Sequence, residues 1–246
     1  MSWTRSIAPE AAPPELRGVY DRIAAGATSG RVANVWQALA LHPAGLETAY
    51  ASYRALTDDP APLTAAQVEM IATVVSATNG CGYCVAHHGP KLAARAGEEL
   101  ARAVARDYRE ANLAARDRVL LDMAVALTCE PDERCAADLE RAREYGFGDD
   151  AIVRAVAIAS WYSFVNRVVL ALGVELEAGR EPWEFGAPRG AAERPRPRPL
   201  RHVGADRDGP QRPPWLPPAF AFSAAFFAAA ACSRAVHGGT TPFERA

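Results

Sequence analysis

Lysine is almost absent from this chain of 246 residues, and arginine supplies nearly all of its positive charge. Lys91 is the only lysine among 27 basic residues. The basic residues nearly balance 29 acidic ones, so the formal net charge at pH 7 is −2. A chain without a net positive charge has no general electrostatic attraction for nucleic acid or for acidic membrane surfaces. We therefore expect neither of them as a partner.

Long apolar runs are also missing. No uninterrupted run reaches the length of about 18 to 20 residues that spans a bilayer, and the first 15 residues contain no apolar segment of the kind found in secretory signals. Five cysteines at scattered spacings are too few for the disulfide framework of a small secreted protein. These absences predict a cytoplasmic protein whose cysteines are reactive, metal-bound or buried.

Signals for β-strands are absent as well, because no run of β-branched and aromatic residues alternates with polar ones. Alanine, leucine, arginine and glutamate dominate instead, and these residues favour helices. Half of the chain is hydrophobic, which is enough to bury a core, so the sequence predicts an all-α fold. The expected helices cover residues 14–25, 31–42, 44–57, 64–78, 82–96, 98–109, 113–128, 132–145 and 149–172.

Several helix ends carry local signals. Thr64 followed by Gln67 forms the pattern of a capping box, and Gly173 stands where a glycine commonly ends a helix. Residues 63–78 also resemble residues 113–128 at a constant offset of 50, which suggests two similar helices that pack as a pair.

The composition changes near residue 187, which divides the chain into a domain over residues 1–186 and a tail over residues 187–246. The tail holds 10 of the 19 prolines, and its 9 basic and 4 acidic residues give it a charge of +5. Alternating arginine and proline over residues 194–199 favours an extended, solvated backbone that builds no core. We expect the tail to be a disordered appendage.

The chemistry-bearing residues gather between Glu69 and His88. Asn79-Gly80 breaks one expected helix, and Cys81 and Cys84 then begin the next. A thiol in the first turn of a helix lies near free N–H groups and the positive end of the helix dipole, which stabilise its thiolate. Two cysteines separated by two residues are close enough to form a reversible disulfide.

Two further groups accompany the cysteines. His88 lies four residues after Cys84 and therefore one turn along the same helix face, where its imidazole can exchange a proton with the thiol. Glu69, on the preceding helix, shares a polar face with Thr73 and Ser76 and can orient the imidazole or relay protons. A nucleophile, a second thiol, a base and a carboxylate are the groups that peroxide reduction through a disulfide requires.

The pattern Glu69-x11-Cys81-x2-Cys84-x3-His88 resembles the motif of alkylhydroperoxidase D-like proteins in the carboxymuconolactone decarboxylase superfamily. Further similarity lies in three downstream blocks and is strongest to the branch of uncharacterised peroxidase-related enzymes. The resemblance covers roughly residues 10–185, and the blocks are Leu127-Thr128-x-Glu130-Pro131, Tyr145-Gly146-Phe147-Gly148-Asp149 and Phe164-x-Asn166-Arg167.

This resemblance implies an all-helical bundle with the CxxC pair at a helix N-terminus, assembled as a homo-oligomer, commonly a trimer or hexamer. It makes Cys84 the peroxidatic thiol and Cys81 the resolving thiol, with Glu69 and His88 as the proton relay and without a cofactor. The partners would be a hydroperoxide and a thiol reductant. Tyr83 departs from the pattern, because the best-understood members carry a second relay histidine there. Lactone decarboxylation is disfavoured, because decarboxylases proper generally lack the CxxC pair.

Three alternatives remain open at this point. The cysteine pair could serve a thiol–disulfide oxidoreductase that has no peroxide specificity. It could form a structural zinc site with His88 and either His87 or Glu69, in a non-catalytic interaction module. Finally, both cysteines could be ordinary core residues, since free cysteine is readily buried.

Overall fold

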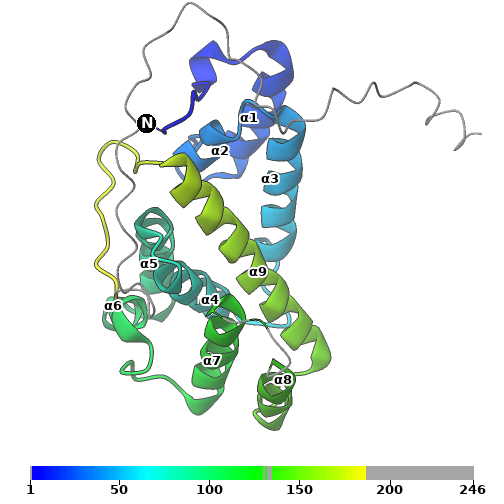
Figure 1. Ribbon diagram of the computed structural model, residues 1–246, viewed down its shortest axis with the longest axis vertical. Helices are drawn as coiled ribbons and strands as arrows, with labels where there is room; N and C mark the ends of the chain where they lie inside the picture. Colours follow the sequence, from blue (N-terminus) through cyan, green and yellow to red (C-terminus); the bar gives the residue numbers. More distant parts are fainter. Residues whose placement is uncertain (1, 130, 132–134, 187–246) are drawn as a thin grey trace, which may run out of the picture. The chain divides into compact units, whose positions relative to one another are not determined.

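The computed structural model describes residues 2–129, 131 and 135–186 (Figure 1). These residues form nine α-helices and one short 3-10 helix and contain no strand, which confirms the all-helical expectation. The expected tail over residues 187–246 lies outside the described residues. The helices are η1 Pro9–Ala11, α1 Pro14–Gly26, α2 Asn34–Ala38, α3 Pro43–Thr57, α4 Ala65–Thr78, α5 Gly82–Ala96, α6 Glu98–Asp107, α7 Ala115–Cys129, α8 Cys135–Glu144 and α9 Asp149–Leu172.

The expected helix over residues 31–42 is much shorter in the structure, where α2 covers five residues. Before α2, the backbone N–H of Asn34 donates to the Glu177 carboxylate, and the Val32 carbonyl accepts from the Gln37 side chain. After it, His42 precedes Pro43 and adopts φ −129°, because proline disfavours the helical region for the residue before it. Long-range bonds at one end and a proline at the other shorten this helix.

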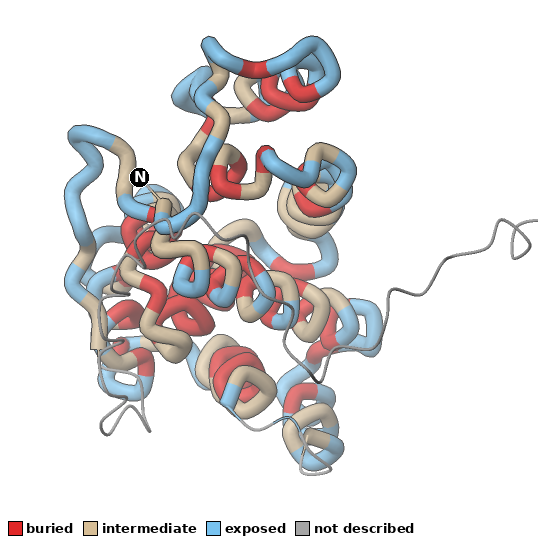
Figure 2. Tube along the Cα trace, turned by 45° about the horizontal axis from the view of Figure 1, so that its top comes forward, coloured by how far each residue is buried: buried red, intermediate tan, exposed pale blue. Residues whose placement is uncertain are grey.

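Helix α4 lies at the centre of the described fold and packs against α5, α6, α7 and α9. Its N-terminus has the predicted capping box, in which Thr64 and Gln67 each bond the other's backbone N–H. Residues 67–77 are all buried, including the polar side chains of Glu69, Thr73 and Ser76. Figure 2 shows buried positions where the helices face one another and exposed positions on the outer turns. Polar groups on this central helix therefore face other residues of the fold.

Helices α4 and α7, which the offset of 50 residues relates, pack against each other as expected. Gln67 Nε2 donates a hydrogen bond of 2.7 Å to Asp117 Oδ1, and these two residues are themselves 50 positions apart. Equivalent positions of the two similar segments therefore meet in the packed pair.

Helix α9 contacts both α4 and α7 and also α2 and α3, so it connects the N-terminal helices with the helices around α4 (Figure 1). Its C-terminus has the expected glycine, with Gly173 in the left-handed region at φ 61°. By length and composition alone α9 could also cross a bilayer, since an 18-residue window has a mean hydropathy of 1.5. The sequence showed no sign of a membrane-spanning length here, because Arg154 and Arg167 interrupt the apolar residues of this helix and leave no long uninterrupted run. In this fold the same helix supplies buried core residues.

The chain continues beyond α9 as a C-terminal segment, residues 174–186, that runs along α5 and α6. Trp183 packs against Gly89 so closely that an added Cβ at Gly89 would lie 2.3 Å from the indole. The Gly186 N–H donates to the Ala105 carbonyl at 3.1 Å. This segment brings residues far along the chain to the start of α5.

Candidate active site

The two cysteines lie side by side at the start of α5. Cys81 is the residue that precedes the helix, Cys84 lies in its first turn, and their Sγ atoms are 2.7 Å apart. Both side chains are buried, with exposed fractions of 0% and 4%. Gly80, at φ 72°, makes the turn from α4, and the Cys81 N–H then donates to the Ser76 carbonyl. The short turn fixes the cysteine pair against the end of α4.

The two thiols differ in acidity. The hydrogen bond with Cys84 lowers the pKa of Cys81, against the opposing effect of burial. Burial raises the pKa of Cys84 well above its ordinary value, and the neighbouring Cys81 raises it further. Cys81 is therefore the more acidic thiol of the pair, and Cys84 is the less acidic one.

A buried amide on α9 lies beside this pair of thiols. Asn166 is fully buried, and its side chain lowers the pKa of each cysteine. It also donates to Ser76 Oγ at 3.1 Å and accepts from Asn79 Nδ2 at 3.0 Å. Asn166 was not among the site residues expected from the sequence, although it stands in one of the blocks that carry the family resemblance.

Glu69 and His88, 19 residues apart, form the second pair. Glu69 Oε2 lies 2.7 Å from His88 Nδ1, and both side chains are buried. Burial lowers the pKa of His88 and outweighs the opposing effect of Glu69. Burial alone would raise the pKa of Glu69, but the His88 contact and the charges of Lys91 and Arg95 lower it below its usual value. At neutral pH this is a carboxylate that orients a neutral imidazole, with Nδ1 as the donor and Nε2 left as the base.

A cavity of about 880 Å³ reaches this site. Cys84 and His88 line it, whereas Cys81 is not among the described residues on its wall. Charged side chains and seven tryptophans and tyrosines also line it, the aromatic ones being Trp36, Tyr50, Tyr53, Tyr83, Trp161, Tyr162 and Trp183. Of the two thiols, Cys84 is therefore the one that lines the cavity.

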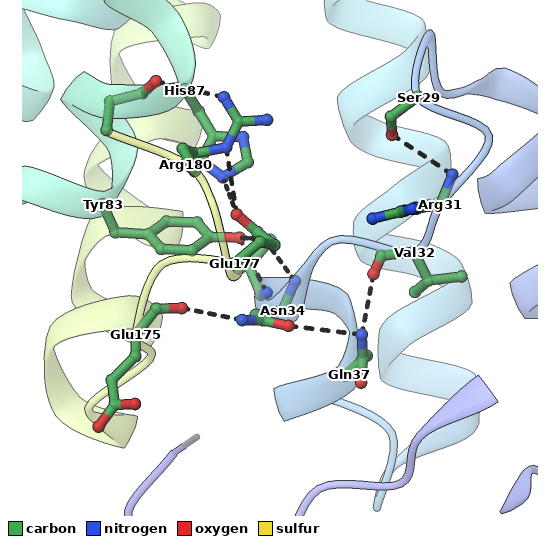
Figure 3. A network of polar contacts seen from close by, with 12 residues as sticks. Ser29, Arg31, Val32, Asn34, Gln37, Tyr83, His87, Glu175, Glu177 and Arg180 are labelled. Atoms are coloured by element: carbon green, nitrogen blue, oxygen red, sulfur yellow. Dashed lines mark hydrogen bonds and ion pairs between the residues drawn. The ribbon is translucent and has the colours of Figure 1, made fainter. Parts of the chain in front are cut away.

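Tyr83 is held in a separate polar network (Figure 3). Its hydroxyl donates to Glu177 Oε1 at 2.7 Å and accepts from the Val35 N–H at 3.2 Å. The same carboxylate binds the Asn34 N–H, His87 Nε2 and the Arg180 guanidinium. Burial and the Glu177 charge raise the pKa of Tyr83 far above its ordinary value.

The Tyr83 network has a structural consequence. Glu177 joins the start of α2, the first turns of α5 and the C-terminal segment, and so closes one wall of the cavity. Hydrogen bonds from His87, Asn34 and Tyr83 hold the pKa of this carboxyl well below its usual range, although burial opposes them. From the sequence His87 was considered only as a possible zinc ligand and Glu177 was given no role, and no local pattern indicates that the two residues meet.

The four residues expected from the sequence therefore occur as two pairs, Cys81 with Cys84 and Glu69 with His88. Cys84 and His88 line the same cavity, without a direct hydrogen bond between them in the described part of the chain. Within residues 2–129, 131 and 135–186, no group of three or more His, Cys, Asp or Glu side chains is placed to hold a metal ion. The arrangement brings together two adjacent thiols, an imidazole bonded to a carboxylate, and a cavity.

Comparison with known proteins places this site in a family. Residues 44–106 match the carboxymuconolactone decarboxylase family. A solved alkylhydroperoxidase AhpD core, an uncharacterized peroxidase-related protein from Ralstonia eutropha JMP134, is 30% identical with a TM-score of 0.65. The match covers 74% of this chain and 97% of that one. The chain belongs to the carboxymuconolactone decarboxylase superfamily, among its alkylhydroperoxidase D-like proteins.

Other superfamily structures extend the comparison. An uncharacterized peroxidase-related protein from Silicibacter sp. TM1040 is 32% identical with a TM-score of 0.62, over 68% of this chain and 87% of that one. The debrominase Bmp8 in complex with 2,3,4-tribromopyrrole is 19% identical with a TM-score of 0.55, over 67% and 87% of the two chains. At that identity the likeness concerns the fold alone. A search of curated proteins finds no match.

Proposed function

We propose that this alkylhydroperoxidase D-like protein is a thiol-dependent peroxidase that reduces organic hydroperoxides through Cys84 and Cys81. The observation that carries the proposal is the Sγ–Sγ distance of 2.7 Å between a cysteine that lines a cavity and one that does not. One thiol meets the substrate and the second is already within reach to resolve the product. The names of the two relatives at 30% and 32% identity, both peroxidase-related proteins, agree with this assignment.

The reaction balances in three steps. Cys84 attacks the terminal peroxide oxygen, so that an S–O bond forms, the O–O bond breaks, and ROOH with the thiol gives an alcohol and a sulfenic acid. Cys81 then attacks the sulfenic sulfur, which forms the disulfide and releases water. An external thiol reductant supplies two thiols, which restore the dithiol and become a disulfide themselves.

The Glu69–His88 pair supplies the proton transfers. His88 Nε2, a base because Nδ1 is bonded to Glu69, accepts the Cys84 proton through the bound peroxide or one water. The same proton then passes to the leaving alkoxide. This transfer is needed because burial disfavours the Cys84 thiolate.

The cavity supports a bulky substrate. Its volume of about 880 Å³ and its aromatic wall suit an apolar organic hydroperoxide better than hydrogen peroxide. We expect cumene hydroperoxide to oxidise the protein faster than hydrogen peroxide does.

A count of free thiols tests the proposal directly. One equivalent of cumene hydroperoxide should remove two thiols, which mass spectrometry should map to a Cys81–Cys84 disulfide. Cys84→Ser should abolish peroxide consumption, and Cys81→Ser should trap a sulfenic acid on Cys84 or a mixed disulfide. Cys129→Ser, at an exposed position, is the matched control and should react as wild type does. If both the Cys84 and the Cys81 variant consumed peroxide at the wild-type rate, the proposed peroxidase function of this cysteine pair would be wrong.

A thiol–disulfide oxidoreductase is the second candidate, favoured by the lowered pKa of Cys81. Burial of both thiols argues against a protein disulfide as its substrate, because such a substrate must reach a sulfur atom. Reduction of insulin faster than reduction of cumene hydroperoxide would favour this second function.

A further inference from the structure

One buried hydroxyl beside the site has no partner. Tyr162 on α9 is 1% exposed, and its hydroxyl makes no hydrogen bond with any residue that the structure describes. An unsatisfied buried hydroxyl destabilises the folded state, because it has lost its hydrogen bonds to water. Such a group therefore calls for an explanation beyond packing.

The position of Tyr162 suggests that explanation. The residue lines the same cavity as Cys84 and His88, and its ring packs edge-on against the His88 imidazole at a centroid distance of 4.7 Å. Burial raises the pKa of Tyr162 well above its ordinary value, and the charges of Glu69 and Cys84 act in the same direction. The phenol therefore stays protonated, and its proton is available to donate a hydrogen bond.

The other tyrosine near the cysteines cannot serve in this way. The Tyr83 hydroxyl already donates to Glu177 and accepts from the Val35 backbone. Tyr83 stands between the two cysteines, where the family resemblance leads one to expect a relay group. The site thus has one phenol whose proton is engaged and one whose proton is available.

We propose that Tyr162 is a catalytic residue that donates a hydrogen bond to the leaving oxygen of the bound hydroperoxide. This inference rests on the proposed peroxidase function and adds the group that stabilises the charge formed there. As the O–O bond breaks and the S–O bond forms, negative charge develops on the leaving oxygen. Tyr162 stabilises that charge and keeps its own proton, while the proton released by Cys84 arrives through His88 and completes the alcohol.

A single-turnover experiment on the full chain tests the proposal. Tyr162→Phe should slow oxidation of the Cys84 thiol by cumene hydroperoxide by about 100-fold, the low end of what removal of one such donor costs. Its thermal midpoint should stay equal to that of wild type or rise, since an unpaired hydroxyl has been removed.

Tyr20→Phe is the matched control. Tyr20 is equally buried, and its hydroxyl donates to the Ile7 carbonyl at 2.7 Å, away from the cavity. The Tyr20 variant should lose stability and keep the wild-type rate. The two variants are therefore predicted to change rate and stability in opposite ways.

The choice of peroxide separates a catalytic role from a structural one. A donor to the leaving oxygen matters more when the leaving alcohol is less acidic. The rate ratio of wild type to Tyr162→Phe should therefore rise with the pKa of the alcohol across a series of hydroperoxides. The pH dependence of Cys84 alkylation by iodoacetamide should not change.

The outcomes distinguish this inference from the proposed function. If wild-type Cys84 reacts with hydroperoxide and Tyr162→Phe reacts equally fast, the inference is wrong and the peroxidase function stands. The inference is also wrong if Tyr83→Phe slows the oxidation of Cys84 by hydroperoxide and Tyr162→Phe does not. If wild-type protein does not react with any hydroperoxide, both proposals are wrong.

Discussion

Glu69 and His88 illustrate how burial and hydrogen bonding set the state of a proton relay. The imidazole is pushed towards its neutral form by burial, although a carboxylate lies 2.7 Å away. A neutral imidazole oriented by a carboxylate is a base at neutral pH. The same desolvation makes the pair sensitive to acid.

We predict that stability falls as the pH drops below about 6.5, the ordinary pKa of histidine in an unfolded chain. Below that pH the His88 side chain is protonated in the unfolded state but still neutral in the folded state, where its pKa is lower. Protonation therefore stabilises the unfolded state, and the free energy of unfolding decreases. The expected loss from this group is about 1 kcal/mol between pH 7.5 and pH 5.5. Chemical denaturation across this range would measure it.

His88→Asn serves as the comparison for this pH prediction. The lowered pKa of Glu69 acts in a more acidic range, below about pH 4.5, and leaves the window from pH 5.5 to 7.5 to the histidine. The variant should therefore show a shallower dependence of stability on pH within that window. An unchanged slope in His88→Asn would contradict the assigned direction of the His88 pKa shift.

At the level of elements, α5 is held from two directions. Its first turn packs against the end of α4, and its second turn packs against the C-terminal segment through Gly89 and Trp183. The Arg102 guanidinium of α6 also stacks over the Trp183 ring, with its central carbon 4.6 Å from the ring centroid. A glycine at position 89 lets the tryptophan approach the helix backbone.

Gly89→Ala should destabilise the protein by about 1–3 kcal/mol, because the new methyl group would overlap the Trp183 ring. Gly18→Ala is the matched control, since Gly18 lies in α1 and the added carbon would lie 3.8 Å from the Arg22 guanidinium, an ordinary van der Waals distance. We expect that variant to be more stable by about 0.5–1 kcal/mol, the helix preference of alanine over glycine. Thermal or urea unfolding would measure both, and equal effects would contradict the packing argument.

At the level of the whole molecule, the described chain has an apolar surface that its own residues leave uncovered. Phe164 on α9 is 46% exposed. It lies with Trp161 beside a shallow groove of about 490 Å³ whose other wall comes from α3. Large exposed aromatic side chains beside a groove are typical of surfaces that contact another protein.

We predict that the protein is a homo-oligomer and that this groove is buried between copies. Phe164→Arg should therefore shift the molar mass measured by light scattering towards that of the monomer. Glu99→Arg, an exposed charge change on α6, is the control and should leave the mass unchanged. A wild-type protein that is monomeric at tens of micromolar would contradict the prediction.

The helices could be predicted because their signals are local. The Thr64–Gln67 capping box, the Asn79-Gly80 break and the Gly173 terminus each depend on residues within one turn of one another. The helix expected over residues 31–42 was too long. Its observed start is set by the backbone N–H of Asn34, which bonds Glu177, 143 residues away. Local periodicity carries no information about such a partner.

By itself the sequence determined the all-helical class, the family and the grouping of two thiols, an imidazole and a carboxylate near α5, because short-range spacing specifies all of them. Only the tertiary structure decided which groups are available for chemistry. It placed Asn166 beside both cysteines, engaged the Tyr83 hydroxyl with Glu177, and left the Tyr162 hydroxyl without a partner. The first two relations join residues 82 to 94 positions apart, and all three arise from the packing of α9 and the C-terminal segment against α4 and α5.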